Sequence, residues 1–226
     1  MDRRNLLRRA GALLLALGAR PPDALAQAPD RDATLVRAAA TGDAAAVRRL
    51  LADGASVHAR DAQRRTALLA ATYGNHVEAA RVLIAAGADV NAQDDIRNSA
   101  FLLAGARGHL AILRLTLAAG ADLKSTNRFG GTALIPACHY GHVETVRELL
   151  ATKIDVDHVN DLGWTALLEA VILGDGGSRH TAIVRMLVAA GANVNIADRQ
   201  GVTPLQHARE RRYREIASIL EQAGAR

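Results

Sequence analysis

The chain has 226 residues, a formal net charge of +5 and one cysteine. Residues 1–26 hold five arginines and two aspartates, a net charge of +3, which leaves +2 of the total for everything that follows. We therefore expect no nucleic-acid partner, because such binding needs a clustered basic face. The lone cysteine, Cys138, excludes an internal disulfide, and we expect it to be a buried, unreactive thiol in a helix.

The first 26 residues predict a signal peptide that is cleaved on export. Residues 10–19 form an apolar run of ten. Ten residues of helix span about 15 Å, half of the roughly 30 Å hydrocarbon core of a bilayer, so no stable membrane insertion is expected. Ala24 and Ala26 place small residues where a signal peptidase needs them, and we expect cleavage between Ala26 and Gln27.

The arginines at the start of this segment bear on the export route. Arg3 and Arg4, followed by two leucines, resemble a twin-arginine signal, although Asp2 stands where Ser or Thr is more usual. The Sec route is the alternative. Either route predicts a periplasmic protein, and secretion from the cell is also open. Residues 27–30 are expected to form a short linker after the cleavage site.

A pattern with a period of 33 residues then recurs along the chain. Each copy opens with a tripeptide such as Thr66-Ala67-Leu68, has Gly-His or a similar pair near its middle, and ends with a sequence such as Gly-Ala-Asp-Val. The opening tripeptides start at Ala33, Thr66, Ser99, Thr132, Thr165 and Thr203. A fixed period in this range indicates a stacked array, in which each unit buries its apolar face against its neighbours.

The second copy illustrates what each unit is expected to form. Thr66 can cap a short helix that Gly74 and Asn75 end, since both residues tolerate the left-handed backbone of a tight turn. Residues 77–86 carry apolar side chains at helical spacing and predict a second helix. A polar segment over residues 89–98 follows, and we expect it to be an extended loop.

Each unit resembles an ankyrin repeat in its opening tripeptide, central Gly-His, Leu-Leu pair and Gly-Ala-x-Val-Asn ending. The resemblance implies an all-α solenoid of helix–turn–helix units joined by extended β-turn or finger loops. The fifth unit carries five extra residues, because Thr165 and Thr203 are 38 apart, and we place them within 174–180 as a solvated loop between the two helices. The six predicted units cover about residues 31–60, 61–93, 94–126, 127–159, 160–197 and 198–226.

Several groups of residues could suggest chemistry, and each has a structural explanation. His76, His109 and His142 share one repeat position, where the resemblance implies hydrogen bonds within the loops rather than metal ligation. The glycines at 174–177 lack the following lysine and the preceding strand of a phosphate-binding loop. Ser178 lacks a nucleophile elbow. We therefore expect no catalytic residue, no metal and no cofactor.

The densest basic cluster, in the last unit, has a structural explanation as well. Arg209, Arg211, Arg212 and Arg214 could bind an anionic partner. However, the last unit of an array has no neighbour on its outer side, so that side must be polar to stay soluble. We expect the cluster to cap the array.

The resemblance implies that the finger loops and first helices line one concave surface that binds another macromolecule. Tyr73, Phe129 and Trp164 fall at these positions, and aromatic side chains are frequent interface anchors. The alternative for Phe129 and Trp164 is packing between neighbouring loops. The candidate partner-binding residues are Tyr73, Ile96, Asn98, Leu103, Arg128, Phe129, His139, Leu162, Trp164, Glu169 and Ile172.

These features predict a monomeric, non-enzymatic scaffold that binds another protein in the periplasm. One alternative is a secreted effector that acts on a host or a neighbouring cell. Another is a small hydrolase or metal-binding protein whose site no motif reveals. The sequence does not identify the partner, because specificity in such arrays depends on scattered surface positions.

Overall fold

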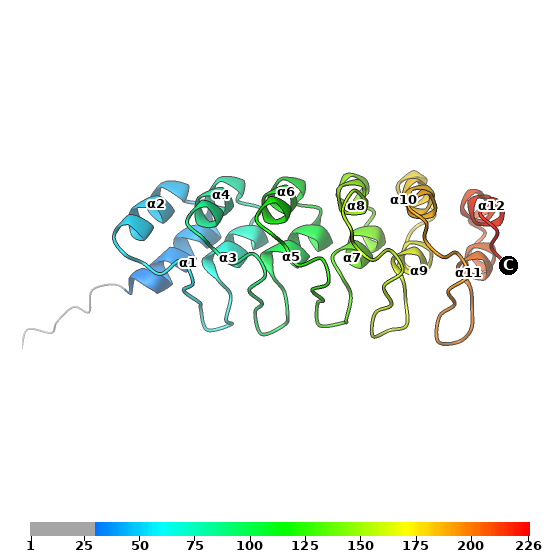
Figure 1. Ribbon diagram of the computed structural model, residues 1–226, viewed down its shortest axis with the longest axis horizontal. Coiled ribbons are helices and arrows are strands. Elements are labelled where there is room, and N and C mark those ends of the chain that lie inside the picture. The colour runs from blue at the N-terminus through cyan, green and yellow to red at the C-terminus, as the bar shows by residue number, and fades with distance from the viewer. Residues whose placement is uncertain (1–29) are drawn as a thin grey trace, which may run out of the picture.

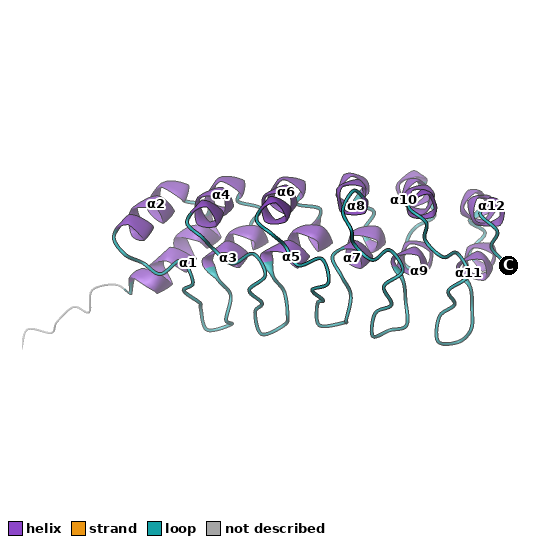
Figure 2. Cartoon of the chain, in the orientation of Figure 1, coloured by secondary structure: helices purple, strands orange, loops and turns teal. Residues whose placement is uncertain are grey.

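The computed structural model describes residues 30–226, which form twelve helices and no strand (Figures 1 and 2). The predicted signal and its cleavage site between Ala26 and Gln27 lie outside the described residues. The first helices of the six pairs are α1 (Arg31–Thr41), α3 (Ala67–Tyr73), α5 (Ala100–Arg107), α7 (Leu134–His139), α9 (Ala166–Ile172) and α11 (Pro204–Glu210). The second helices are α2 (Ala44–Ala52), α4 (Val77–Ala85), α6 (Leu110–Ala118), α8 (Val143–Leu150), α10 (Ser178–Ala189) and α12 (Arg214–Gln222).

The helix pairs stack side by side into one elongated array. Figure 1 shows the first helices in one row and the second helices in a parallel row, with loops that project beyond the first helices. Each first helix packs against the next first helix, as α7 does against α9, and each second helix packs against the next second helix. The predicted all-α solenoid is confirmed.

Polar caps and small residues position the first helices. Thr66, Ser99 and Thr165 each accept a hydrogen bond from the backbone N–H three residues later, at 3.1 to 3.2 Å. These caps satisfy a backbone donor that the helix itself leaves free. One alanine in the middle of each first helix from α3 onwards is fully buried, which lets neighbouring first helices approach closely. These residues are Ala71, Ala104, Ala137, Ala170 and Ala208.

Five finger loops connect the units, at residues 53–66, 86–99, 119–133, 151–165 and 190–203. In each loop the Oδ1 atom of one Asp or Asn accepts hydrogen bonds from the backbone N–H groups of the residues two and four positions later. Asn160, for example, accepts from Leu162 and Trp164, both at 3.0 Å. Such local bonds stabilise a single turn conformation, so the loop tips present their side chains in a common orientation. The equivalent residues are Asp61, Asp94, Asn127 and Asp198.

The insertion in the fifth unit differs from the sequence prediction. The second helix α10 begins at Ser178 and has 12 residues, whereas α4 and α6 have 9. Part of the extra length therefore continues the helix. The expected loop over residues 174–180 is shorter than predicted, because residues 178–180 are helical.

The same insertion displaces the histidine of the repeat. His180 is buried, and its Nε2 donates a hydrogen bond to the carbonyl oxygen of His139 at 2.9 Å. His76 makes the same bond to the carbonyl oxygen of Ala40 at 3.0 Å. His109 keeps the position, but its buried Nε2 has no hydrogen-bond partner. His180 is thus the fifth unit's counterpart of His76.

The glycine-rich loop at residues 174–177 is partly covered by Tyr213 of the last unit. The Tyr213 hydroxyl donates a hydrogen bond to the carbonyl oxygen of Gly174 at 2.9 Å. The Tyr213 ring lies against Gly176, where a Cβ atom would be 2.3 Å from Tyr213 Cδ1. The loop is therefore only partly solvated: Asp175 and Gly177 are exposed, whereas the Tyr213 side chain packs on Gly174 and Gly176.

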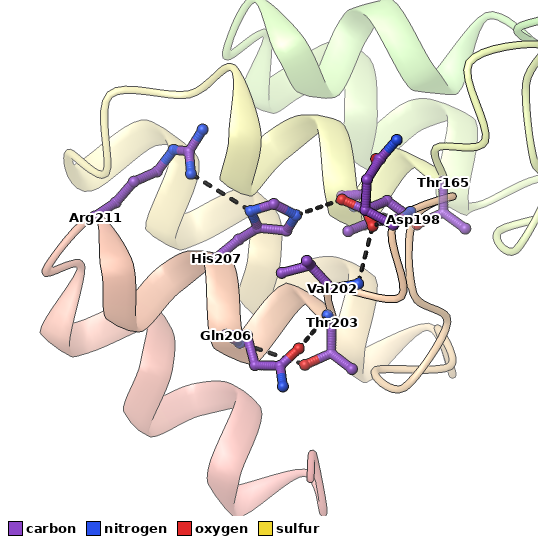
Figure 3. A network of polar contacts seen from close by, with 9 residues as sticks. Thr165, Asp198, Val202, Thr203, Gln206, His207 and Arg211 are labelled. Atoms are coloured by element: carbon purple, nitrogen blue, oxygen red, sulfur yellow. Dashed lines mark hydrogen bonds and ion pairs between the residues drawn. The ribbon is translucent and has the colours of Figure 1, made fainter.

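Polar contacts organise the start of the last unit (Figure 3). Thr203 and Gln206 cap α11 reciprocally, each side chain bonding the other residue's backbone N–H. His207 Nε2 lies 2.7 Å from Asp198 Oδ2, and Arg211 Nη1 lies 3.5 Å from His207 Nδ1. These bonds fix the last finger loop against α11.

The basic cluster lies on the outer side of the last unit. Arg209, Arg212 and Arg214 are exposed, and Arg209 Nη2 lies 2.7 Å from Glu221 Oε1 of α12. An exposed, ion-paired arginine at a position that is buried in the inner units agrees with a capping role.

Candidate docking pocket

A hollow on the finger side spans units three to five and has a volume of about 320 Å³. We call it the central pocket. Its walls come from three successive finger loops, and its floor comes from α5, α7 and α9. The lining residues are Ile96, Asn98, Ala106, Asn127, Arg128, Phe129, Gly131, Ile135, Pro136, His139, Tyr140, Asn160, Leu162, Glu169 and Leu173.

Exposed apolar side chains are concentrated in this pocket. Six large hydrophobic side chains of the described residues are well exposed, and five of them line the central pocket. All six side chains are 41 to 55% exposed, and the one that does not line the pocket is Val159. Isolated exposed hydrophobic residues are ordinary, but a contiguous group marks an interaction surface. The five are Ile96, Phe129, Tyr140, Leu162 and Leu173.

The repeat explains how three of these side chains form a row. Ile96, Phe129 and Leu162 are spaced by 33 residues and occupy the same place on three successive fingers. The equivalent residues on the two outer fingers are Gln63 and Gln200. The apolar row is therefore limited to the central units, with a polar residue at each end.

The floor of the pocket contains a carboxyl group. Glu169 Oε1 accepts a hydrogen bond from Asn160 Nδ2 at 3.0 Å, and Glu169 Oε2 lies 3.7 Å from His139 Nδ1. Burial raises the pKa of the Glu169 carboxyl to about 7, although the bond from Asn160 acts in the opposite direction. Burial and the nearby His180 lower the pKa of His139, whose ring stacks on Tyr140 with ring centroids 4.2 Å apart.

Seven of the eleven candidate partner-binding residues come together here. Of the other four, Tyr73 lines a smaller hollow of about 250 Å³ on the amino-terminal side, which shares Ile96 with the central pocket. Trp164, Leu103 and Ile172 line neither hollow. The seven are Ile96, Asn98, Arg128, Phe129, His139, Leu162 and Glu169.

Two candidates are more buried than expected. Leu103 is 5% exposed and Glu169 is 7% exposed. Both occupy one repeat position, on the side of the first helix that faces its own finger loop, as the bond between Glu169 and Asn160 shows. Leu103 is therefore a packing residue, and its expected exposure is wrong. Glu169 is also covered, but it still reaches the central pocket.

Trp164 is partly buried at the base of its finger. Its backbone N–H donates to Asn160 Oδ1, and its carbonyl oxygen accepts from the Asn160 N–H, both at 3.0 Å. These bonds close the turn whose tip carries Leu162. Its place at the base, rather than the tip, explains why it does not line the pocket.

Sequence reasoning missed Tyr140 and Leu173. Both stand just after a first helix, at a repeat position that holds Gly74, Arg107 and Arg211 in other units. At this position the residue changes from small or charged to apolar in two adjacent units. That change is the sequence feature that marks the two residues. A comparison of every repeat position across the units would have identified it.

The single cysteine, next to a residue that lines the pocket, is not activated for catalysis. Cys138, next to His139, is fully buried, and burial together with Glu169 raises the pKa of its thiol well above the usual value. The thiol is therefore protonated and unsuited to act as a nucleophile. Among residues 30–226, no three His, Cys, Asp or Glu side chains converge as metal ligands, and no helix is long and apolar enough to cross a membrane.

Comparison with known proteins identifies the family. The sequence profile described as ankyrin repeats (three copies) matches residues 9–94 and 101–198, which is well over half of the chain. The chain belongs to the ankyrin repeat family. A crystal structure of an ankyrin repeat domain from Acinetobacter baumannii is 57% identical, with a TM-score of 0.83, and the match covers 85% of this chain and 98% of that one.

Other ankyrin repeat structures are similar over the same region. The ankyrin repeat protein EF0377 is 40% identical, with a TM-score of 0.80, over 83% of this chain and 96% of that one. The ankyrin repeat domain of human ASB11 is 26% identical, with a TM-score of 0.71, over 85% and 84%. YahD of Escherichia coli (strain K12), named as an ankyrin repeat protein, is 49% identical over 57 residues, which span 25% of this chain and 28% of that relative. The ankyrin fold is in general a scaffold for protein–protein interaction, and no catalytic site is evident in the described residues.

Proposed function

We propose that this protein is a non-enzymatic scaffold that binds a partner protein through the central pocket. The observation that carries the proposal is the gathering of Ile96, Phe129, Tyr140, Leu162 and Leu173 around one hollow. Aromatic and aliphatic side chains that are exposed in the free protein and lie at the centre of a surface are the usual anchors of an interface.

The rigidity of the finger loops supports this proposal. The Asn127 and Asn160 side chains hold their loop tips through backbone hydrogen bonds of 2.9 to 3.1 Å. A binding surface that is already ordered loses little conformational entropy when a partner docks. The apolar row on the fingers is therefore preorganised for binding in the free protein.

The test is to truncate one anchor and measure binding. Tyr140→Ala should weaken the binding of a partner captured from a periplasmic extract by roughly 2 kcal/mol or more, about 30-fold, as for a central aromatic anchor. The thermal unfolding midpoint should change little, because the Tyr140 side chain is 55% exposed. Calorimetric titration of the captured partner and thermal melts of both proteins measure the two effects.

Val159→Ala is the matched control. Val159 is 47% exposed, similar to the five apolar residues of the pocket, but it does not line the pocket. The proposal requires that this change leave binding intact. Trp164→Ala addresses the remaining aromatic candidate: a loss of affinity equal to that of Tyr140→Ala would move the binding surface away from the pocket.

We also propose that the protein acts in the periplasm after export. The support is the sequence of residues 1–26, with its arginine pair, short apolar run and Ala24-Leu25-Ala26. N-terminal sequencing of the protein from a periplasmic fraction should begin at Gln27. A cytosolic chain that begins at Met1 would contradict export, and recovery from the culture medium would favour a secreted effector. Replacing Arg3 and Arg4 by lysine should block export only on the twin-arginine route.

A further inference from the structure

The central pocket contains a carboxylate oxygen with no donor of its own. The Glu169 side chain is 9% exposed, and its Oε1 accepts from Asn160. The nearest ring nitrogen to Oε2 is His139 Nδ1 at 3.7 Å, which is beyond hydrogen-bonding distance. Because Glu169 lines the pocket, a ligand can supply the missing donor. A carboxylate in such a largely buried site is costly to ionise, and a donor from a ligand would relieve that cost.

Two sequence changes in the fifth unit create this arrangement. The repeat position of Glu169 holds Arg37, Ala70, Leu103, Pro136 and His207 in the other units. The finger residue nine positions before Glu169 is Asn160, whereas it is aspartate in units two, three and six. An aspartate here would place two carboxylates together, whereas the Asn160 amide donates to Glu169. The unit thus keeps one buried carboxyl group and no competing charge beside it.

Glu169 sets the charge of the pocket floor. Arg128 lines the rim, where it is exposed and its guanidinium lies over the Phe129 ring, 4.8 Å from the ring centroid. His139 of α7 has a lowered pKa and is therefore mainly neutral near pH 7. The walls are the apolar and aromatic side chains already described. Such walls suit the aliphatic stem and planar head of a basic side chain.

We propose that the central pocket receives a lysine or arginine side chain of the partner protein, flanked by apolar residues, with the Glu169 carboxylate as its counter-charge. This inference rests on the proposed function. The cation lies against Glu169 Oε2, the stem contacts Tyr140 and Phe129, and the flanking apolar residues contact the row on the fingers. The volume of about 320 Å³ is at the low end of the roughly 300–1,000 Å³ typical of ligand pockets, so it fits one large side chain rather than a folded element.

The proposal gives binding a defined pH dependence. The bound cation favours the ionised carboxylate, so binding releases a proton wherever free Glu169 is protonated. With a pKa of about 7, the ionised fraction and hence the affinity rise about tenfold between pH 6 and pH 8.

Among the neighbouring titratable groups, His139 and Cys138 do not reverse this dependence. On α7 a protonated His139 would compete with the ligand at low pH, which acts in the same direction. The Cys138 thiol stays neutral, since burial raises its pKa. On α10, His180 lies against Asp175, and on α11, His207 lies against Asp198.

A phage-displayed library of random 12-residue peptides, selected on the immobilised full chain, tests the proposal. We expect the selected peptides to share one lysine or arginine between apolar residues. A synthetic peptide of that sequence should bind Glu169→Gln on the order of 30-fold or more weakly, as for loss of one partner of a buried charge pair. Replacing its basic residue by norleucine should cause a similar loss on the wild type and little further loss on Glu169→Gln. Circular dichroism checks that each variant is folded, and Glu210→Gln, an exposed change outside the pocket, is the control.

The outcomes separate this inference from the proposed function. Selected peptides without a basic residue, or equal binding to the wild type and to Glu169→Gln, would overturn the inference. If Tyr140→Ala still abolishes that binding, the pocket remains the docking surface. If Tyr140→Ala and Phe129→Ala both leave binding unchanged, the proposed function fails as well. A library that yields no binder counts against both.

Discussion

Replacing Glu169 by glutamine should stabilise the folded protein by about 3 kcal/mol at pH 8 and by almost nothing at pH 4. Burial raises the pKa of this carboxyl from 4.5 to about 7. A difference of one pKa unit corresponds to about 1.4 kcal/mol, so ionising Glu169 in the folded state costs about 3 kcal/mol relative to the unfolded chain. Glutamine has no such cost and can still bond to Asn160. Urea unfolding of both proteins at several pH values between 4 and 8 measures the difference.

The sign follows from which state binds the proton more tightly. Between pH 4.5 and pH 7 the folded protein keeps the Glu169 proton while the unfolded chain has lost it, so the stability contributed by this proton falls as the pH rises through that window. The aspartates Asp61 and Asp198 have lowered pKa values and act in the opposite direction at more acidic pH. Both proteins contain these aspartates. Subtracting the unfolding free energy of Glu169→Gln from that of the wild type at each pH therefore removes the contribution of the aspartates. A constant difference from pH 4 to 8 would show that Glu169 ionises without penalty.

This instability is informative about function. A buried carboxyl that weakens the fold at neutral pH fits the trade-off between stability and function that is common at binding sites. In the proposed complex, a cation of the partner against Glu169 Oε2 would offset part of this cost. Stability and binding should therefore respond to Glu169→Gln in opposite directions: the fold gains and the affinity falls.

The fold was predictable because its determinants are local and periodic. The opening Thr66, Ser99 and Thr165 cap their helices as expected, and the buried alanines follow at a constant spacing. The insertion was harder to predict, because its conformation depends on a residue far along the chain. Tyr213 packs on Gly176 from the next unit, and no local pattern within residues 174–180 contains that information.

The pocket was only partly predictable for a similar reason. The period places Ile96, Phe129 and Leu162 on equivalent finger positions, so their shared surface follows from the sequence alone. Burial does not follow as directly. Leu103 and Glu169 occupy the same repeat position and are both covered, yet only the polar end of Glu169 reaches the pocket. Whether a residue lines a surface depends on how the finger loop folds back over its own helix.

Replacing Phe101 by alanine should cost about 3–5 kcal/mol of unfolding free energy, as expected for a large aromatic side chain removed from a packed core. Phe101 is fully buried in α5, at the repeat position that other units fill with leucine. Each unit packs only against its neighbours, so a cavity in the third unit weakens both of its interfaces. The amino-terminal and carboxy-terminal parts of the array should then unfold less cooperatively.

The single tryptophan makes this loss of cooperativity measurable. Trp164 lies in the finger before α9, so its fluorescence reports on the carboxy-terminal half, whereas circular dichroism reports on all helices. For Phe101→Ala the two urea transitions should separate, and for the wild type they should coincide more closely. Phe129→Ala is the matched control, because it removes the same side chain from a position that is 48% exposed and should change stability by no more than about 0.5 kcal/mol. Equal losses for the two variants would mean that Phe129 is a packing residue of the fingers, and the central pocket would then lose one of its anchors.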